Sequence, residues 1–130
     1  MTLLRGTVES GVGEGMRFMS LGWVRVGVRQ ALGFDPYPGT LNLRLPDAEA
    51  LGRWREIRAK NGRPLTPPPS ESCGGCLVPV TVATAIPAAV IVPDITRYGD
   101  DVLELIAAVH LRSHLGLQDN DPVLLECESS

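Results

Sequence analysis

The first candidates for chemistry are two polar side chains, Thr40 and Asn42, that follow a rigid corner at residues 36–39. Residues 40–45 read Thr-Leu-Asn-Leu-Arg-Leu, and this alternation of polar and apolar types predicts a half-buried strand. Alternate side chains of a strand share a face, so Thr40 and Asn42 would lie roughly 6–7 Å apart. A hydroxyl and an amide oxygen placed in this way could bind a hard cation that also holds phosphates. For these residues alone, a capped turn leading into an ordinary strand is the simpler account.

A second candidate is the glycine-rich stretch at residues 10–16, Ser-Gly-Val-Gly-Glu-Gly-Met, which follows a strand expected at residues 3–9. Glycines at a spacing of two allow the backbone to turn tightly and to point successive N–H groups into one concavity, which can bind phosphate oxygens. A plain hairpin turn explains the same residues. The stretch is not a Rossmann fingerprint, because no long helix and later acidic residue complete a β-α-β unit.

The bulk composition indicates one globular domain spanning residues 1–130. Hydrophobic residues make up 44% of the chain and charged residues 21%, which is ordinary for a globular fold. The net charge of −3 argues against a nucleic-acid binder, which would need a basic surface. No apolar run approaches the length of a membrane span, so we expect no membrane partner. Three cysteines without a secretion signal indicate a reducing, cytoplasmic location.

Two helices are expected in the first half of the chain. Residues 20–32 place apolar side chains at helical spacing and are followed by Gly33, a typical helix end, so we favour a helix there. Alternating valines in the same stretch would equally fit a strand. Asp47 can cap a second helix over residues 48–60. The proline-rich residues 63–70 predict a stiff surface loop without regular structure.

The second half of the chain is expected to be mainly β-structure. Residues 77–92 predict two buried strands joined near residues 85–88, and a last strand covers residues 123–127. Residues 102–109 have helical spacing, although residues 103–107 could themselves be a strand. With about six short strands and two or three helices in total, the chain predicts an α+β or barrel-like fold.

Cys73 and Cys76 form a Cys-x-x-Cys pattern, which can be half of a zinc site or a redox pair. No second cysteine pair lies at a suitable spacing. In a redox pair the first cysteine typically lies at the N-terminus of a helix, whereas a β-rich run follows here. We therefore interpret these residues as structural or incidental thiols.

Several pieces of sequence occur together in a set order. They are the glycine-rich residues 6–15, the Pro-Tyr-Pro-Gly-Thr-Leu-Asn block within residues 32–43, Thr96 followed by Glu104, Val-His-Leu-Arg at 109–112, and Leu-Gln-Asp-Asn-Asp at 117–121. This set resembles the CTP-dependent riboflavin kinase family, best known from archaea. The resemblance runs almost end to end and is weakest near residues 53–72. Ala108 and Asn120 depart from a proline and a glycine that are usual in the family.

The resemblance implies a mainly β fold with short helices, a six-stranded cradle-loop barrel. It implies an enzyme that transfers the terminal phosphate of CTP to the 5′-hydroxyl of riboflavin, giving FMN and CDP. Riboflavin and CTP would therefore be the small-molecule partners. Carried over by position, the residues that would bind the nucleotide are Gly11, Val12, Gly13, Glu14, Gly15, Met16, Val109, His110, Leu111 and Arg112.

The resemblance also implies the remaining site residues. Thr40 and Asn42 would bind Mg²⁺, and Thr96 and Glu104 would contact the flavin. Glu104 is the one carboxylate in the matched flavin segment, so we expect it to orient or deprotonate the hydroxyl of riboflavin. Because the glycine-rich stretch lies upstream and Thr96 and Glu104 lie downstream, we favour the magnesium role for Thr40 and Asn42 over a plain turn. A catalytically inactive flavin- or nucleotide-binding regulatory module of the same fold is the alternative.

Overall fold

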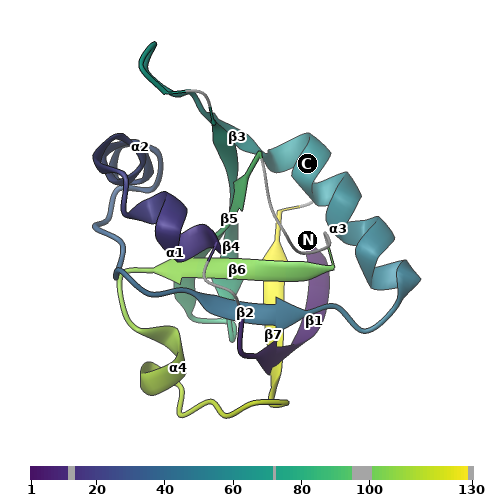
Figure 1. The fold of residues 1–130 in the computed structure, drawn as a ribbon. Coiled ribbons are helices and arrows are strands. Elements are labelled where there is room, and N and C mark those ends of the chain that lie inside the picture. The colour runs from purple at the N-terminus through teal and green to yellow at the C-terminus, as the bar shows by residue number, and fades with distance from the viewer. Residues whose placement is uncertain (12–13, 72, 95–100, 129–130) are drawn as a thin grey trace.

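The structure, a computed structural model, describes residues 1–11, 14–71, 73–94 and 101–128, with the backbone alone at residues 14 and 15. Within these ranges the chain forms seven strands and four helices (Figure 1). The strands are β1 (Thr2–Glu9), β2 (Leu41–Arg44), β3 (Arg63–Leu65), β4 (Gly75–Val82), β5 (Ile86–Pro93), β6 (Val102–Ala107) and β7 (Pro122–Cys127). The helices are α1 (Glu14–Met19), α2 (Gly22–Leu32), α3 (Ala48–Asn61) and α4 (Leu111–His114).

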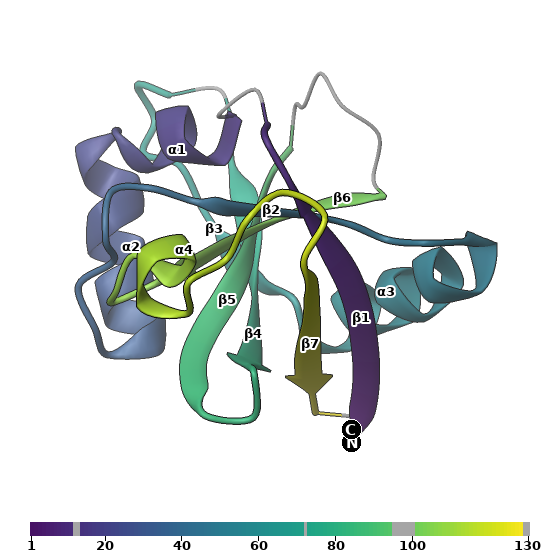
Figure 2. The ribbon, with the colours of Figure 1, turned by 90° about the horizontal axis from the view of Figure 1, so that it is seen from below.

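Six of these strands close into an antiparallel barrel. Hydrogen-bonded neighbours follow the order β4-β5-β6-β2-β1-β7, and the end of β4 pairs back with β7. The start of β1 and the end of β7 lie side by side (Figure 2), with Thr2 opposite Cys127. β3 adds to the first half of β4 outside the ring. Closure leaves the six strands of the ring without a free edge, and the predicted six-stranded barrel is confirmed.

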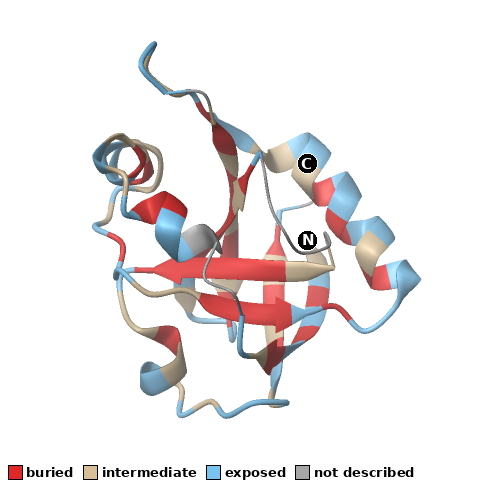
Figure 3. Cartoon of the chain, viewed as in Figure 1, coloured by how far each residue is buried: buried red, intermediate tan, exposed pale blue. Residues whose placement is uncertain are grey.

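Apolar side chains fill the barrel and the space between its wall and two helices. The interior cluster includes Leu4, Leu43 and Leu125 and also takes in Trp54 of α3, which is 2% exposed. A second cluster joins Phe18 of α1 and residues of α2 to the outer faces of β4, β5 and β6. Strand β6 contributes to both clusters and is almost wholly buried (Figure 3).

The two helices expected in the first half of the chain are confirmed. Helix α2 ends at Gly33, whose φ of 78° lies in the left-handed region that favours glycine at a helix end. Helix α3 begins after Asp47, whose carboxylate accepts a hydrogen bond of 2.9 Å from the backbone N–H of Ala50. None of the helices in the described ranges is both long and apolar enough to cross a membrane.

Two expectations about prolines were wrong. Residues 63–65 are not loop but form β3, because an edge strand tolerates the missing N–H of Pro64. The hairpin between β4 and β5 turns at residues 83–85 rather than near 85–88, with Ala83 and Thr84 at positive φ. Pro87 lies within β5 opposite Thr81, so the proline marks the start of a strand and not its break.

Periodicity left one element open and missed another. Residues 102–107 form a strand, which was one of the two alternatives. Their apolar residues face both clusters, and burial on two faces produces a continuous apolar run that also fits helical spacing. Helix α1 was not predicted at all, because its six residues are too few to show a period; Phe18 and Met19 bury its apolar side.

The buried thiol of Cys127 predicts a pH dependence of stability. Burial raises its pKa from 9.0 to about 11. The pKa of this thiol is higher in the native protein than in the unfolded chain. Below about pH 9 the thiol is protonated in both states, so its ionisation does not change the free energy of unfolding. Between about pH 9 and 11 only the unfolded chain ionises readily, and the free energy of unfolding falls. Urea unfolding across this range should show a steeper loss of stability than in Cys127→Ala. Identical slopes in the two proteins would contradict this account.

Candidate functional site

The barrel brings Thr40, Asn42 and Glu104 together on neighbouring strands. β2 pairs with β6 so that Asn42 lies directly opposite Glu104. Thr40 immediately precedes β2, and its hydroxyl donates a hydrogen bond of 3.0 Å to Glu104 Oε2. Asn42 is 8% exposed and Glu104 is 1% exposed, so both polar side chains are held inside the protein. A hydroxyl, an amide and a carboxylate therefore converge at one place in the sheet.

The amide oxygen of Asn42 is the most informative atom in this group. Asn42 Oδ1 is buried and accepts no hydrogen bond from the described residues. Leaving a buried polar group unsatisfied costs about 1–3 kcal/mol, so such groups are rare in folded proteins. An amide oxygen held beside a hydroxyl and a carboxylate is a hard ligand of the kind that Mg²⁺ prefers. The residues present therefore fit a magnesium ion.

The backbone at Gly11 runs directly against Asn42. A Cβ placed on Gly11 would lie 1.2 Å from Asn42 Nδ2, a distance that no packing can accommodate. The approach follows from the sheet, because Glu9 at the end of β1 lies opposite Asn42 on the side away from Glu104. The glycine-rich stretch thus begins beside the candidate metal ligand. Val12 and Gly13, where a phosphate-binding turn was predicted, lie outside the described residues.

The rest of the glycine-rich stretch leads into helix α1. Glu14 and Gly15 are its first residues, and the exposed Met16 follows them. The sequence predicted a turn here and not a helix, because the three glycines of the stretch are unfavourable in a helix. Thr96, predicted to contact the flavin, lies outside the described residues, so Glu104 is the predicted flavin residue whose position is known.

The predicted nucleotide segment, residues 109–112, is linked to Ser10 at the start of the glycine-rich stretch. Arg112 pairs with Asp119 at 2.6 Å, and the other carboxylate oxygen of Asp119 accepts a hydrogen bond of 3.5 Å from Ser10 Oγ. His110 packs against Tyr37 with ring centroids 4.9 Å apart, which ties the segment to the proline-rich corner. Leu111 is buried in the barrel cluster, where its side chain packs into the core.

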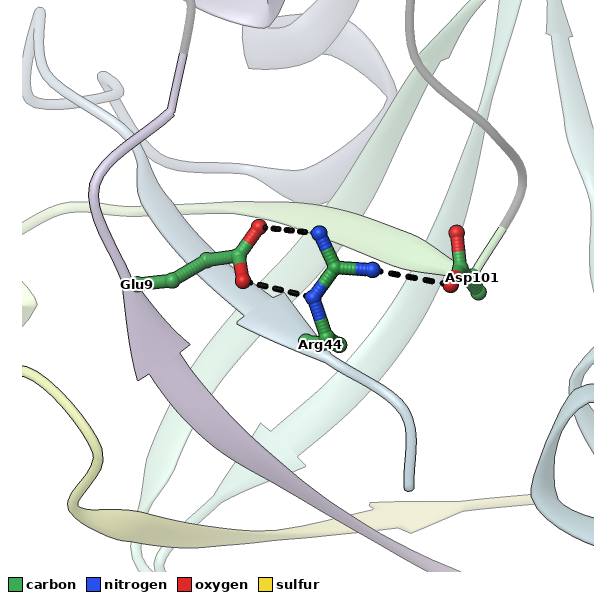
Figure 4. A network of polar contacts seen from close by, with 3 residues as sticks. All are labelled: Glu9, Arg44 and Asp101. Carbon is green, nitrogen blue, oxygen red and sulfur yellow. Dashed lines mark hydrogen bonds and ion pairs between the residues drawn. The ribbon is translucent and has the colours of Figure 1, made fainter. Parts of the chain in front are cut away.

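Sequence reasoning missed the charged residues that surround Asn42. Arg44 binds both carboxylate oxygens of Glu9, at 2.7 and 2.9 Å, and one oxygen of Asp101 at 2.9 Å (Figure 4). The pKa of Arg44 is raised, mainly by its hydrogen bond to Glu9 and next by the electrostatic attraction of the same carboxylate. A signal for Arg44 was present, because it lies two residues after Asn42 on the same face. Its partners are 35 and 57 positions away, and no local pattern identifies them.

One departure from the family pattern has a simple conformational explanation. Asn120 adopts a φ of 73° in the turn before β7. Asparagine is one of the few residues besides glycine that enters this region readily. Its replacement of the usual glycine therefore preserves the turn, in which the N–H of Asn120 donates to the carbonyl of Val8.

Fold and site together define a class: a small closed antiparallel barrel with buried polar side chains in its wall beside a glycine-rich stretch. The family model CTP-dep_RFKase, described as Domain of unknown function DUF120, matches residues 8–127. The chain therefore belongs to the CTP-dependent riboflavin kinase family.

Curated relatives agree with this assignment. A riboflavin kinase of Aeropyrum pernix is 42% identical, over 93% of this chain and 92% of its own length. Riboflavin kinases of Halobacterium salinarum and Archaeoglobus fulgidus are 39% and 40% identical over 97% and 95% of this chain, but over 57% and 53% of their own lengths. The chain thus spans little more than half the length of several relatives that it matches.

The contact between Gly11 and Asn42 predicts a selective effect of a single methyl group. Gly11→Ala should push the Asn42 side chain away, because the new Cβ would occupy the position of its amide group. The side-chain amide signals of Asn42 in a ¹⁵N–¹H correlation spectrum should therefore move.

Gly52→Ala is the matched control, since a Cβ there meets nothing within 4 Å. It should leave the Asn42 signals in place and stabilise helix α3 by ~1 kcal/mol. Unmoved Asn42 signals in Gly11→Ala would show that the side chain is not held by this contact.

Proposed function

We propose that this protein is a riboflavin kinase that transfers the terminal phosphate of CTP to the 5′-hydroxyl of riboflavin, giving FMN and CDP. The observation that carries the proposal is the buried Asn42 amide oxygen beside Thr40, Glu104 and Gly11 in a chain of this family. The relatives named riboflavin kinase support the acceptor, and the family name supports CTP as the donor. We further propose a cytoplasmic location, with riboflavin and CTP as partners.

Thr40 and Asn42 would hold Mg²⁺ in this proposal. Magnesium in phosphate-transfer sites is usually bound by one or two protein groups together with substrate phosphates, so two oxygen ligands suffice. Because Thr40 Oγ1 donates its proton to Glu104, its lone pairs are available to a cation. When bound, the ion would neutralise charge on the phosphates and help to align them.

The protein would bind the nucleotide around the end of β1. Backbone N–H groups of the glycine-rich residues 11–16 would hold the phosphates, which need no basic side chain there. Arg112 would offset further negative charge, and its pairing with Asp119 keeps the guanidinium near Ser10. Val109, His110 and Leu111 would line the rest of the nucleotide site. The net charge of −3 makes such local placement necessary.

Glu104 would act on the acceptor, with Thr96 as a second contact to the flavin. Its carboxylate is fixed by the hydrogen bond from Thr40, so it can accept a hydrogen bond from the 5′-hydroxyl in a constant direction. Phosphoryl transfer depends mainly on positioning and on neutralising charge. Orientation of the hydroxyl is therefore the main task of Glu104, and it would take the hydroxyl proton as the phosphate is transferred.

The test is an assay of FMN formation from riboflavin with Mg²⁺ and either CTP or ATP. The proposal expects FMN with CTP, a lower rate with ATP, and no product after chelation of divalent cations with EDTA. No FMN with either donor would contradict the proposal. If calorimetry then showed binding of riboflavin or CDP without turnover, the inactive binding module would be the correct reading.

A further inference from the structure

Arg44 stands between two strands that carry opposite sides of the candidate site. β2 lies between β1 and β6, and Arg44 faces Thr7 on the first and Val102 on the second. It follows Asn42 by two residues, so the two side chains share a face. From this position its guanidinium reaches both neighbouring strands (Figure 4).

The bonds to the two strands differ in strength and kind. Glu9, the last residue of β1, receives two parallel hydrogen bonds, the bidentate arrangement that fixes both distance and direction. Asp101, which directly precedes β6, receives one from Arg44 Nη1. The backbone N–H of Leu45, the residue after β2, also donates to the carbonyl of Asp101 at 2.8 Å, so two consecutive residues hold Asp101.

Each strand end leads directly to a residue of the site. Two positions after Glu9 comes Gly11, whose backbone touches the Asn42 amide. Three positions after Asp101 comes Glu104, which lies opposite Asn42. One guanidinium therefore fixes the segment that would bind the nucleotide and the segment that would bind the acceptor.

We propose that Arg44 is a positioning residue that sets the spacing between the nucleotide side and the acceptor side of the site. This inference rests on the proposed function. Arg44 acts through Glu9 and Asp101 and not by touching substrate. Its charge also compensates two carboxylates that would otherwise repel an incoming nucleotide. A lysine could supply the charge but not the planar bidentate geometry.

The experiment compares Arg44→Met with three further variants. Arg44→Met should raise KM for both CTP and riboflavin about five-fold, with little change in melting temperature because the pairs are half-exposed. Glu9→Ala should raise chiefly the KM for CTP, and Asp101→Ala chiefly the KM for riboflavin. Arg44→Lys should recover part of the loss, since it retains the charge.

Arg53→Met is the matched control. Arg53 is as exposed as Arg44 and pairs with Glu49 on helix α3, so its loss removes an ion pair away from the site. It should leave both KM values unchanged. Unaltered KM values in Arg44→Met, equal losses in Arg53→Met, or losses that follow a lowered melting temperature would each overturn the inference.

Failure of the proposed function would be visible separately. If the unaltered protein made no FMN, calorimetric affinities for CDP and for riboflavin would replace the KM values. Arg44→Met should then weaken both affinities, and Arg53→Met neither. Equal affinities in Arg44→Met and the unaltered protein would overturn the inference whatever the activity.

Discussion

The pairing of β2 with β6 is the constraint on which the site depends. Leu41 and Leu43 lie opposite Leu105 and Leu103, and all four are buried in the barrel. A slip of one residue would turn these leucines out of the core, so burial of the leucines selects the register. The same register places Asn42 opposite Glu104. Hydrophobic packing on one face of the sheet thus determines the geometry of the polar group on the other.

The pair of Asn42 and Glu104 is costly because both polar side chains are buried. Among the described residues, the two polar or charged side chains classed as buried are Asn42 and Glu104, and they are neighbours. An unsatisfied amide oxygen lowers stability, and an apolar pair at this position would pack without that penalty. Function explains its presence better than folding does, because a cation bound with phosphates would satisfy the oxygen.

Local sequence pattern predicts the placement of Thr40 and Asn42 better than it predicts the type of the neighbouring element, β6. Strict alternation at residues 40–45 was sufficient to place Thr40 and Asn42 on one face, since the period of a strand is local. Strand β6 remained ambiguous because it is buried on both faces, and periodicity distinguishes strands from helices only when one face is polar.

Contacts between distant parts of the chain could not be predicted from local pattern. Arg44 meets Glu9 and Asp101 only after the barrel closes, and Gly11 meets Asn42 for the same reason. The resemblance to a family supplied Glu104 as a candidate site residue, whereas the structure shows its hydrogen bond to Thr40. Sequence patterns thus identify candidate ligands, and tertiary structure identifies what holds them in place.

The most direct test of the account is the linkage between Mg²⁺ and nucleotide binding at Asn42. Calorimetry should measure the affinity for CDP with and without Mg²⁺, in the unaltered protein and in Asn42→Ala. The account predicts that Mg²⁺ tightens CDP binding to the unaltered protein and that Asn42→Ala removes most of this gain while remaining folded. An equal gain in both proteins would contradict the assignment of Asn42 as a metal ligand.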